Sequence, residues 1–322
     1  MSVKDKVLEY LELGRGTAAS GGALALRLGV SRNAVFKAVG ELRDAGYDII
    51  SSRGGYTLSK NDNTLSVCGI EKYLSESKYN IRLYNTVPST NNVVKEMAER
   101  GAPKWTVAVA EGQTAGRGRL GRTFVSPART GIYMSVLLRP DIALEKVTLI
   151  TVAAAVSAVR AIEKHSGKTA EIKWVNDVYV GGKKVCGILT EASLDAEISK
   201  ISYAVLGVGI NVALPCGGFD GEAKGVAAAL FDTATAELRS MIIADFLNFF
   251  SEYYEKDLAR AIPFYRERQY LVGRRAEIVR GGKTHVVDVL DVDKNCALVV
   301  KFDDGHTENI TSGDVSVHAA NG

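Results

Sequence analysis

The stretch from Glu111 to Arg139 constrains this chain more than any other, because a glycine- and arginine-rich loop runs directly into an apolar strand. The loop reads GRGRLGR from Gly116 to Arg122. Glycine lets backbone amides come close to an anion, and a guanidinium group supplies a permanent charge in a planar donor fork. The sequence therefore predicts either a cover for a polyanion, such as a nucleotide phosphate, or a solvated basic loop.

Two common phosphate-binding motifs do not account for this stretch. The Walker motif GxxxxGK[ST] is absent. Residues 116–121 match the pattern GxGxxG in sequence, but they lack the structural context that this motif requires. A dinucleotide-binding fold needs a strand before those glycines, a helix after them and an acidic residue about 20 residues further on. Residues 123–127 and 132–138 instead favour a loop and a strand, so we expect no such fold here.

Four further motifs accompany the loop in a fixed order along the chain. They are Ser89-Thr90-Asn91, Lys173-Trp174-Val175-Asn176-Asp177, Lys184-Val185-Cys186-Gly187-Ile188-Leu189 and Gly207-Val208-Gly209-Ile210-Asn211. The ordered set resembles the biotin–protein ligases, whose pattern reads STN, GRGRxGR, KWPND, KxxGIL and G[IVA]G[IL]N. Together with its N-terminal segment, the whole chain resembles the bifunctional type of this family, which is also the biotin operon repressor.

The resemblance implies a ligase that works in two steps. The carboxylate of biotin attacks the α-phosphate of ATP to give biotinyl-5′-AMP and pyrophosphate, and a lysine of a biotin carboxyl carrier protein domain then displaces AMP. The first step brings two anions together, so fixed cations and Mg²⁺ are expected beside them. Lys184 and Arg119 are the catalytic candidates. Without its motif, Lys184 would be only a solvated lysine after the Gly181-Gly182 turn.

The resemblance also assigns binding residues by their positions. Biotin is expected to contact Ser89, Thr90, Asn91, Gln113, Arg117, Gly118, Arg119 and Lys184. The nucleotide is expected to contact Arg119, Arg122, Phe124, Asn176, Asp177 and Asn211. No residue is assigned as a metal ligand.

Several of these residues also have purely structural interpretations. The Ser-Thr-Asn run is a good helix N-cap, Asp177 fits a turn between two strands, and Asn211 fits the end of a strand. The glycines of the last two motifs leave room for a ligand against a sheet, although glycine in a strand can also mark a bulge.

Two positions depart from the family pattern. Phe124 stands where the family has a tryptophan after the basic loop, and Val175 stands where KWPND has proline. Phe124 keeps an aromatic face but lacks the indole N–H, and Val175 lacks the rigidity of proline. Neither change removes a charged group, so both bear on binding details rather than on the reaction.

The N-terminal residues predict a winged helix-turn-helix. An amphipathic helix over residues 3–12 is followed by a short helix that Gly29 ends, and Ser31 caps a third helix. Residues 49–58 then favour a hairpin that turns at Gly54-Gly55 and would form the wing.

The outer side of the third helix supplies candidates for DNA contact, near the end that normally enters a major groove. They are Ser31, Arg32, Asn33, Phe36 and Lys37, with Arg53 on the wing. The basic excess is small, because residues 27–53 hold five basic and three acidic side chains. Such a unit could be a protein–protein module, but the turn and the wing favour operator DNA.

The whole chain is expected to be a multidomain α+β protein. A polar linker over residues 60–65 ends a winged helix-turn-helix domain at residues 1–62. Strands interleaved with helices predict a mixed-sheet α/β ligase domain over residues 66–270. Short alternating strands, with one turn at Gly281-Gly282, predict a β-barrel over residues 271–322, similar to the SH3-like C-terminal domain of the family.

Composition agrees with a cytoplasmic protein of two or three domains, for which 322 residues are enough. The net charge of +3 gives no global attraction for polyanions, so any nucleic-acid surface must be local. Cys68, Cys186, Cys216 and Cys296 form no CxxC pair, which argues against a zinc site and a disulfide framework. No apolar run is long enough to span a bilayer, and the first residues lack the apolar core of a signal peptide.

Two other functions stay open at the level of sequence. A repressor that senses ligand but has lost catalysis would keep the pocket, although intact Lys184, Arg117 and Arg119 argue against it. A lipoate or octanoate ligase would share the catalytic fold, although such enzymes generally lack the GRGRxGR loop. In the favoured interpretation, biotinyl-5′-AMP is the corepressor and the ligand-bound chain is a homodimer on operator DNA.

Overall fold

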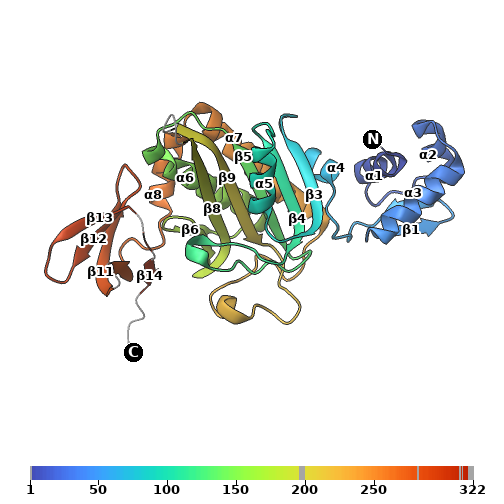
Figure 1. Ribbon diagram of the computed structural model, residues 1–322. Helices are drawn as coiled ribbons and strands as arrows, with labels where there is room; N and C mark the ends of the chain where they lie inside the picture. Colours follow the sequence, from blue (N-terminus) through green and yellow to red (C-terminus); the bar gives the residue numbers. More distant parts are fainter. Residues whose placement is uncertain (1, 196–199, 281–282, 312, 314, 318–322) are drawn as a thin grey trace.

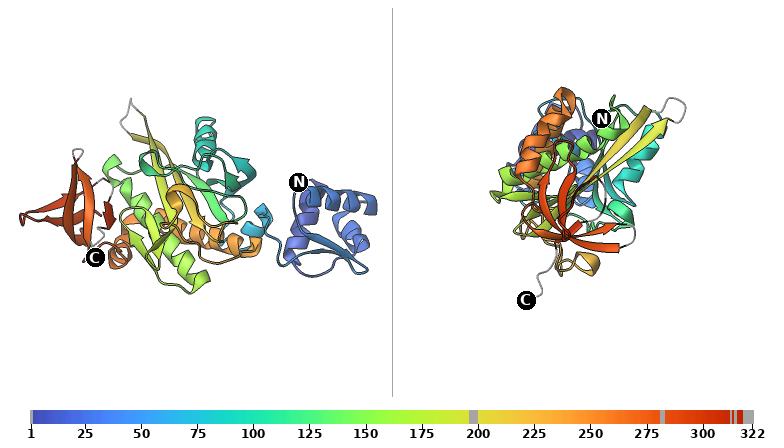
Figure 2. Two further views of the ribbon diagram at one scale, coloured as in Figure 1. Left: turned by 90° about the horizontal axis from the view of Figure 1, so that it is seen from below. Right: turned by 90° about the vertical axis from the view of Figure 1, so that its left-hand side faces the viewer.

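The computed structural model of this protein describes residues 2–195, 200–280, 283–311, 313 and 315–317. Three units follow one another along the molecule: a small helical unit, a broad sheet with helices, and a small all-β unit (Figures 1 and 2). The N-terminal and C-terminal units lie at opposite ends of the central one. The predicted turn at Gly281-Gly282 lies outside the described residues.

The N-terminal unit is a helix-turn-helix followed by a hairpin. Its elements are α1 (Val3–Leu13), α2 (Gly21–Leu28), α3 (Arg32–Asp44), β1 (Ile49–Ser52) and β2 (Gly55–Leu58). Ser31 caps α3, since its side chain accepts a hydrogen bond from the Ala34 amide at 3.1 Å. Gly29 ends α2 with a φ of 65°, in the left-handed region that glycine tolerates best.

The hairpin and a separate core complete this unit. Ser52 pairs with Gly55, so the turn lies at Arg53-Gly54, and the predicted turn at Gly54-Gly55 is wrong by one residue. The buried apolar side chains of the unit form a cluster of their own, apart from the core of the central sheet. The unit therefore folds around buried residues of its own, against which Cys68 of the following helix also packs.

The central unit is built on a seven-stranded mixed sheet in the order β3-β4-β5-β9-β8-β7-β6. Its strands are β3 (Asn80–Val87), β4 (Thr106–Gln113), β5 (Gly131–Leu138), β6 (Ala170–Lys173), β7 (Asp177–Val180), β8 (Lys183–Asp195) and β9 (Lys200–Asn211). β3 and β4 run parallel, and the other neighbouring pairs run antiparallel. β5 confirms the strand predicted at residues 132–138.

Helices cover both faces of this sheet. On one face, α5 (Thr90–Glu99) packs over β4, β5 and β9. On the other face, α6 (Thr148–Ser166) and α7 (Ala236–Lys256) bury apolar residues in the main core. The short helices α4 (Val67–Glu71) and α8 (Ile262–Glu267) lie near the beginning and the end of the unit. No helix in the described part of the chain combines the length and the apolar character that crossing a membrane requires.

The C-terminal unit is a five-stranded antiparallel sheet in the order β13-β12-β11-β10-β14. Its strands are β10 (Arg275–Arg280), β11 (Lys283–Val292), β12 (Leu298–Phe302), β13 (Thr307–Ile310) and β14 (Val315–Val317). The predicted helix-turn-helix and central mixed sheet are thus confirmed, and the last unit is all-β.

A fully buried arginine, Arg239 on α7, joins three parts of the chain. Its guanidinium donates to the Glu111 carboxylate at 2.7 Å, to Oδ1 of Asn63 at 3.0 Å and to the carbonyl of Gly131 at 3.2 Å. The other oxygen of Glu111 accepts a hydrogen bond from the Leu65 amide at 2.6 Å. Because Glu111 precedes the glycine-rich loop and Gly131 follows it, Arg239 holds both ends of that loop together with the linker.

Candidate active site

Strand glycines shape the sheet face beneath the site. Gly187 in β8 pairs with Gly209 in β9, and Gly207 lies two residues earlier on the same face. A Cβ on Gly209 would lie 2.5 Å from the Phe124 ring, and one on Gly207 would lie 2.1 Å from Oδ1 of Asn91. The chain's own Phe124 and Asn91 therefore fill the room that we expected these glycines to leave for a ligand.

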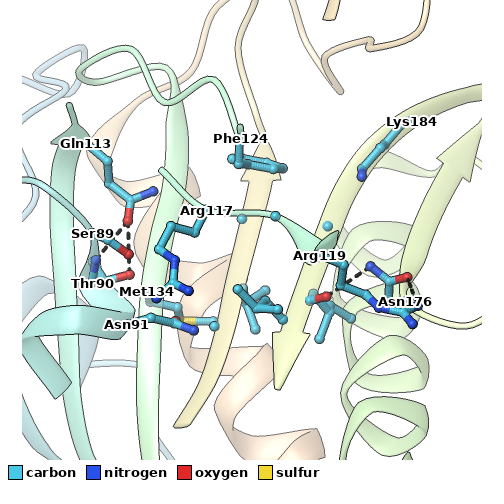
Figure 3. A pocket seen from close by; sticks show the side chains of 17 residues that line it. Ser89, Thr90, Asn91, Gln113, Arg117, Arg119, Phe124, Met134, Asn176 and Lys184 are labelled. Carbon is cyan, nitrogen blue, oxygen red and sulfur yellow. Dashed lines mark hydrogen bonds between the residues drawn. The ribbon is translucent and has the colours of Figure 1, made fainter. Parts of the chain in front are cut away.

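A first hollow opens above this face, with about 40 Å³ of free space. Every residue expected around biotin lines it: Ser89, Thr90, Asn91, Gln113, Arg117, Gly118, Arg119 and Lys184. Figure 3 shows Ser89, Thr90, Asn91 and Gln113 on one side and Arg119, Asn176 and Lys184 on the other. The fold thus brings together side chains that belong to separate motifs.

Hydrogen bonds fix the polar side of the first hollow. Oε1 of Gln113 accepts from the backbone N–H of Thr90 at 2.8 Å and from its hydroxyl at 3.2 Å. The buried Ser135 hydroxyl lies 2.6 Å from Oδ1 of Asn91 and 2.7 Å from Oγ1 of Thr90. Ser89 occupies the N-cap position of α5, but its side chain makes no capping hydrogen bond. The capping interpretation is therefore wrong for the Ser89 side chain.

A second, larger hollow with about 200 Å³ of free space adjoins the first. Every residue expected around the nucleotide lines it: Arg119, Arg122, Phe124, Asn176, Asp177 and Asn211. Asn211 is also the last residue of β9, and Asp177 is the first residue of β7. Their structural interpretations and their places in the hollow are compatible.

The two hollows meet at residues that line both of them, which are Gly118, Arg119, Phe124, Asn176 and Lys184. Nζ of Lys184 lies 2.7 Å from Oδ2 of Asp177. Arg119 donates to Oδ1 of Asn176 at 3.0 Å, and the Asn176 amide donates to Asp177 at 2.9 Å. Two cations thus stand between the hollows, where they would face a carboxylate from one side and a phosphate from the other.

The glycine-rich loop folds back on itself beside these cations. The Gly118 amide donates to the carbonyl of Arg122 at 2.7 Å, and the Phe124 amide donates to that of Gly116 at 2.9 Å. A Cβ on Gly116 would lie 2.3 Å from the Phe124 carbonyl oxygen, so the close approach requires glycine there. The loop leads into β5 rather than into a helix, which confirms that it is not a dinucleotide-binding turn.

Some residues of the site carry no motif. Phe219 and Val226, from the segment after β9, line the second hollow, as do Gly313 and Val315 of the C-terminal unit. Only the folded chain brings such distant residues to the site. Glu191 in β8 contacts two of the expected biotin residues, and its position two residues after the KxxGIL strand motif was the one available signal.

The residues expected to contact DNA are exposed on the N-terminal unit. They are Ser31, Arg32, Asn33, Phe36 and Lys37 at the start of α3, and Arg53 at the hairpin turn. Val35, Val39 and Leu42 lie behind them in the core. Phe36 is 66% exposed beside basic side chains, an arrangement that suits contact with base edges.

Known protein families match two parts of this chain. The sequence model of the "Biotin/lipoate A/B protein ligase family" matches residues 83–211, and that of an "HTH domain" matches residues 4–57. Over 239 residues the chain is 38% identical to "Bifunctional ligase/repressor BirA" of Bacillus subtilis, and the match covers 73% of each protein. The chain belongs to the bifunctional ligase/repressor family.

Other members agree with this placement. The Escherichia coli "Bifunctional ligase/repressor BirA" is 29% identical over 203 residues, which is 63% of this chain and 62% of that protein. The structure of "Biotin protein ligase from Aquifex aeolicus in complex with biotin and ATP" shares the fold, with a TM-score of 0.60 and 24% identity. It covers 75% of this chain and 99% of that one. As a bifunctional ligase/repressor, the chain combines a biotin ligase with a helix-turn-helix repressor, which confirms the predicted resemblance.

Proposed function

We propose that this bifunctional ligase/repressor activates biotin with ATP and then transfers it to a lysine of a biotin carboxyl carrier protein domain. The observation that carries the proposal is the pair of hollows that meet at Arg119 and Lys184. An adenylate forms only when a carboxylate reaches an α-phosphate, and bound reactants gain much from being held in that geometry. Here the two anions meet beside two fixed cations.

The first hollow is the biotin site. Thr90, Asn91 and Gln113, with Ser89, offer hydrogen-bonding groups to the ureido head, while Met134 and its apolar neighbours face the rest of the ligand. A few aimed polar groups in an otherwise apolar pocket suit a ligand with one neutral polar end.

The cations at the meeting point are the catalytic groups. Lys184 exchanges its contact with Asp177 for the biotin carboxylate and the α-phosphate, and Arg119 approaches the same phosphate. Arg117 and Gly118 close the biotin side of the loop over the ligand. Each aimed charge of this kind is worth roughly 3 kcal/mol in the transition state.

The second hollow is the nucleotide site. Arg122, Asn176, Asp177 and Asn211 face the nucleotide, and Phe124 packs an aromatic face against it. Mg²⁺ commonly uses one or two carboxylates together with substrate phosphates, and Asp177 beside Asn176 fits that requirement. When bound, the ion would neutralise phosphate charge. The described residues include no group of three His, Cys, Asp or Glu side chains that could hold a metal ion.

The repressor function belongs to the N-terminal unit. Ser31, Arg32, Asn33, Phe36 and Lys37 bind operator DNA through α3, and Arg53 binds through the wing. Biotinyl-5′-AMP is the corepressor, and the ligand-bound chain binds DNA as a homodimer, which presents two recognition helices to two half-sites.

The three domains extend over residues 1–62, 66–270 and 271–322, the last of them an SH3-like β-barrel. Five antiparallel strands in this last segment support that assignment. The protein works in the cytoplasm, where thiols stay reduced, in agreement with its free cysteines.

Replacing Lys184 with alanine tests the catalytic assignment. We expect biotin-dependent pyrophosphate release to fall at least about tenfold, because a tenfold loss corresponds to only about 1.4 kcal/mol. The matched control is Lys183→Ala, which removes the same charge from the exposed neighbouring position. Unchanged melting curves with activity within about threefold of the wild type in Lys184→Ala would overturn the assignment.

The same assay separates biotin ligation from the two other functions. The matched family model names both biotin and lipoate ligases, whereas the curated relatives reported above are named as ligase/repressors. Excess lipoate should leave biotin-dependent pyrophosphate release unchanged. Competition by lipoate would point to a lipoate ligase, and no release at all would point to a repressor without catalysis.

A further inference from the structure

Glu191 in β8 lies behind the biotin side of the site, outside the described residues that line either hollow. Its carboxylate accepts a hydrogen bond from Nδ2 of Asn91 at 2.8 Å and one from Nζ of Lys95 at 2.6 Å. The same carboxylate lies 3.2 Å from Nη2 of Arg117. One acidic group therefore touches both α5 and the glycine-rich loop.

The contact with Glu191 fixes which way the Asn91 amide points. The N–H side of the amide faces Glu191, and its oxygen faces the Ser135 hydroxyl at 2.6 Å. That oxygen also lies over Gly207, where a Cβ would come within 2.1 Å of it. A carboxylate accepts hydrogen bonds and donates none, so Glu191 selects the amide orientation that presents nitrogen to it.

The contact with Arg117 fixes the loop. Arg117 is the first arginine of the loop, and its side chain is 44% exposed. Its other terminal nitrogen donates to Oδ1 of Asn92 at 3.0 Å. Without Glu191, the contact that Arg117 would keep among the described side chains is the neutral hydrogen bond to Asn92, and Arg117 would lie near the like charge of Lys95. The loop would then lose its ionic contact with β8.

The charges at this point favour an ionised Glu191. Burial raises the pKa of the Glu191 carboxyl, but hydrogen bonds from Asn91 and Lys95 and the charges of Lys95 and Arg117 outweigh burial and hold that pKa below its usual value. The carboxylate therefore carries its charge at neutral pH.

We propose that Glu191 is a positioning residue for the ligase reaction, because it orients Asn91 toward the ureido group of biotin and anchors the loop through Arg117 before the ligand arrives. The inference rests on the proposed biotin site. It predicts that Glu191 governs the binding of biotin and leaves the chemistry at Lys184 and the binding of ATP unchanged.

The test compares Glu191→Gln with Glu163→Gln in pyrophosphate release, with biotin and ATP varied separately. Glu163 is a suitable control, because it is also partly buried and paired with an arginine, Arg268 at 3.2 Å, and it is absent from the described lining of both hollows. We expect Glu191→Gln to raise the KM for biotin about tenfold, with kcat and the KM for ATP within about threefold of the wild type. An equal rise in Glu163→Gln, or a biotin KM within twofold of the wild type in Glu191→Gln, would overturn the proposal.

Limited digestion with trypsin tests the anchoring without any turnover. In the unliganded protein, cleavage after Arg119 and Arg122 should be several-fold faster in Glu191→Gln than in the wild type, and unchanged in Glu163→Gln. If Glu191→Gln does not fold, Lys95→Met can replace it, because it removes one partner of the Glu191 carboxylate. A biotin KM about two- to threefold above that of the wild type would then support the proposal. An unchanged biotin KM would contradict it. If the wild type released no pyrophosphate, the proposed function would be refuted. Even then, equal rates of trypsin cleavage in the wild type and Glu191→Gln would refute the anchoring of the loop by Glu191.

Discussion

The two ends of the central unit are attached to their neighbours in different ways. The N-terminal unit has its own apolar core and meets the linker and α4 through hydrogen bonds between polar groups. The buried apolar residues of the C-terminal sheet instead belong to the same continuous cluster as the core of the central unit. The first attachment can be broken without exposing a core, and the second cannot.

Buried polar groups carry the N-terminal attachment. The Glu12 carboxylate in α1 accepts from the hydroxyl of Ser66 at 2.6 Å and pairs with Arg15 at 2.8 Å. Tyr47 donates its hydroxyl to the Leu65 carbonyl at 2.8 Å, and burial raises the pKa of that phenol. Together with the contacts of Arg239 to Asn63 and Glu111, these groups fix the linker.

Apolar contact with a few hydrogen bonds carries the C-terminal attachment. The indole N–H of Trp174 donates to the Cys296 carbonyl at 2.8 Å, across the boundary between the units. Near this boundary, Tyr265 is fully buried and donates to the Val175 carbonyl at 3.1 Å. Burial raises the pKa of the Cys296 thiol to about 11, which keeps it protonated and unreactive.

Shortening the chain at either end should give the largest difference between the two attachments. A chain ending at residue 270 exposes the shared core and should lose cooperative melting, because each large apolar side chain exposed costs about 1.5–3 kcal/mol. A chain starting at Asn63 should melt cooperatively and keep pyrophosphate release within about threefold, while losing operator binding. Cooperative melting of the chain that ends at residue 270 would contradict the comparison, and operator binding by the chain that starts at Asn63 would refute the helix-turn-helix assignment.

Removing single charged side chains should give losses of stability of intermediate size. Arg239→Met leaves the buried Glu111 carboxylate without its ionic partner, so we expect a loss of about 3–5 kcal/mol in the free energy of unfolding. Arg266→Met, which breaks the exposed 2.6 Å pair with Asp291, should cost less than about 1 kcal/mol. Urea denaturation of both variants measures the two free energies of unfolding. Equal losses would mean that the buried pair stabilises the protein no more than the exposed pair does.

The smallest expected effect concerns communication through the linker. Asn63→Ala removes the side-chain acceptor for Arg239 and the 2.7 Å hydrogen bond to the Arg129 carbonyl, while the backbone carbonyl of residue 63 still accepts from Arg239. The change is worth about 1 kcal/mol. In the wild type, operator affinity should rise from no ligand to biotin plus ATP at fixed salt. That rise should shrink about fivefold in Asn63→Ala, with unchanged pyrophosphate release and no shrinkage in the exposed control Asn61→Ala. An intact rise in Asn63→Ala would show that the linker contact does not transmit the ligand signal.

The sequence predicted the lining of the site better than it predicted the attachments. Charged residues and glycines in fixed motifs, such as Lys184 and Gly116, are required by chemistry or by close backbone approach, and these requirements can be read locally. Arg239 and Glu111 lie 128 positions apart and belong to no periodic pattern, so their pairing depends on the fold. The glycines beneath the site showed that something lies close to the sheet, but their spacing alone did not distinguish a ligand from Phe124.

The position of Arg239 has a consequence for the entropy of closing the glycine-rich loop. Glu111 lies near the end of β4 and Gly131 begins β5, and one buried guanidinium contacts both residues. A second contact brings the two ends of the loop closer still, because the backbone N–H of Gln113 donates to the Ser126 carbonyl at 3.0 Å. The loop is therefore a closed ring before any ligand arrives, and the entropic cost of bringing its ends together has already been met during folding. Ligand binding then has to order only the short segment within that ring, which leaves more of the binding free energy for affinity.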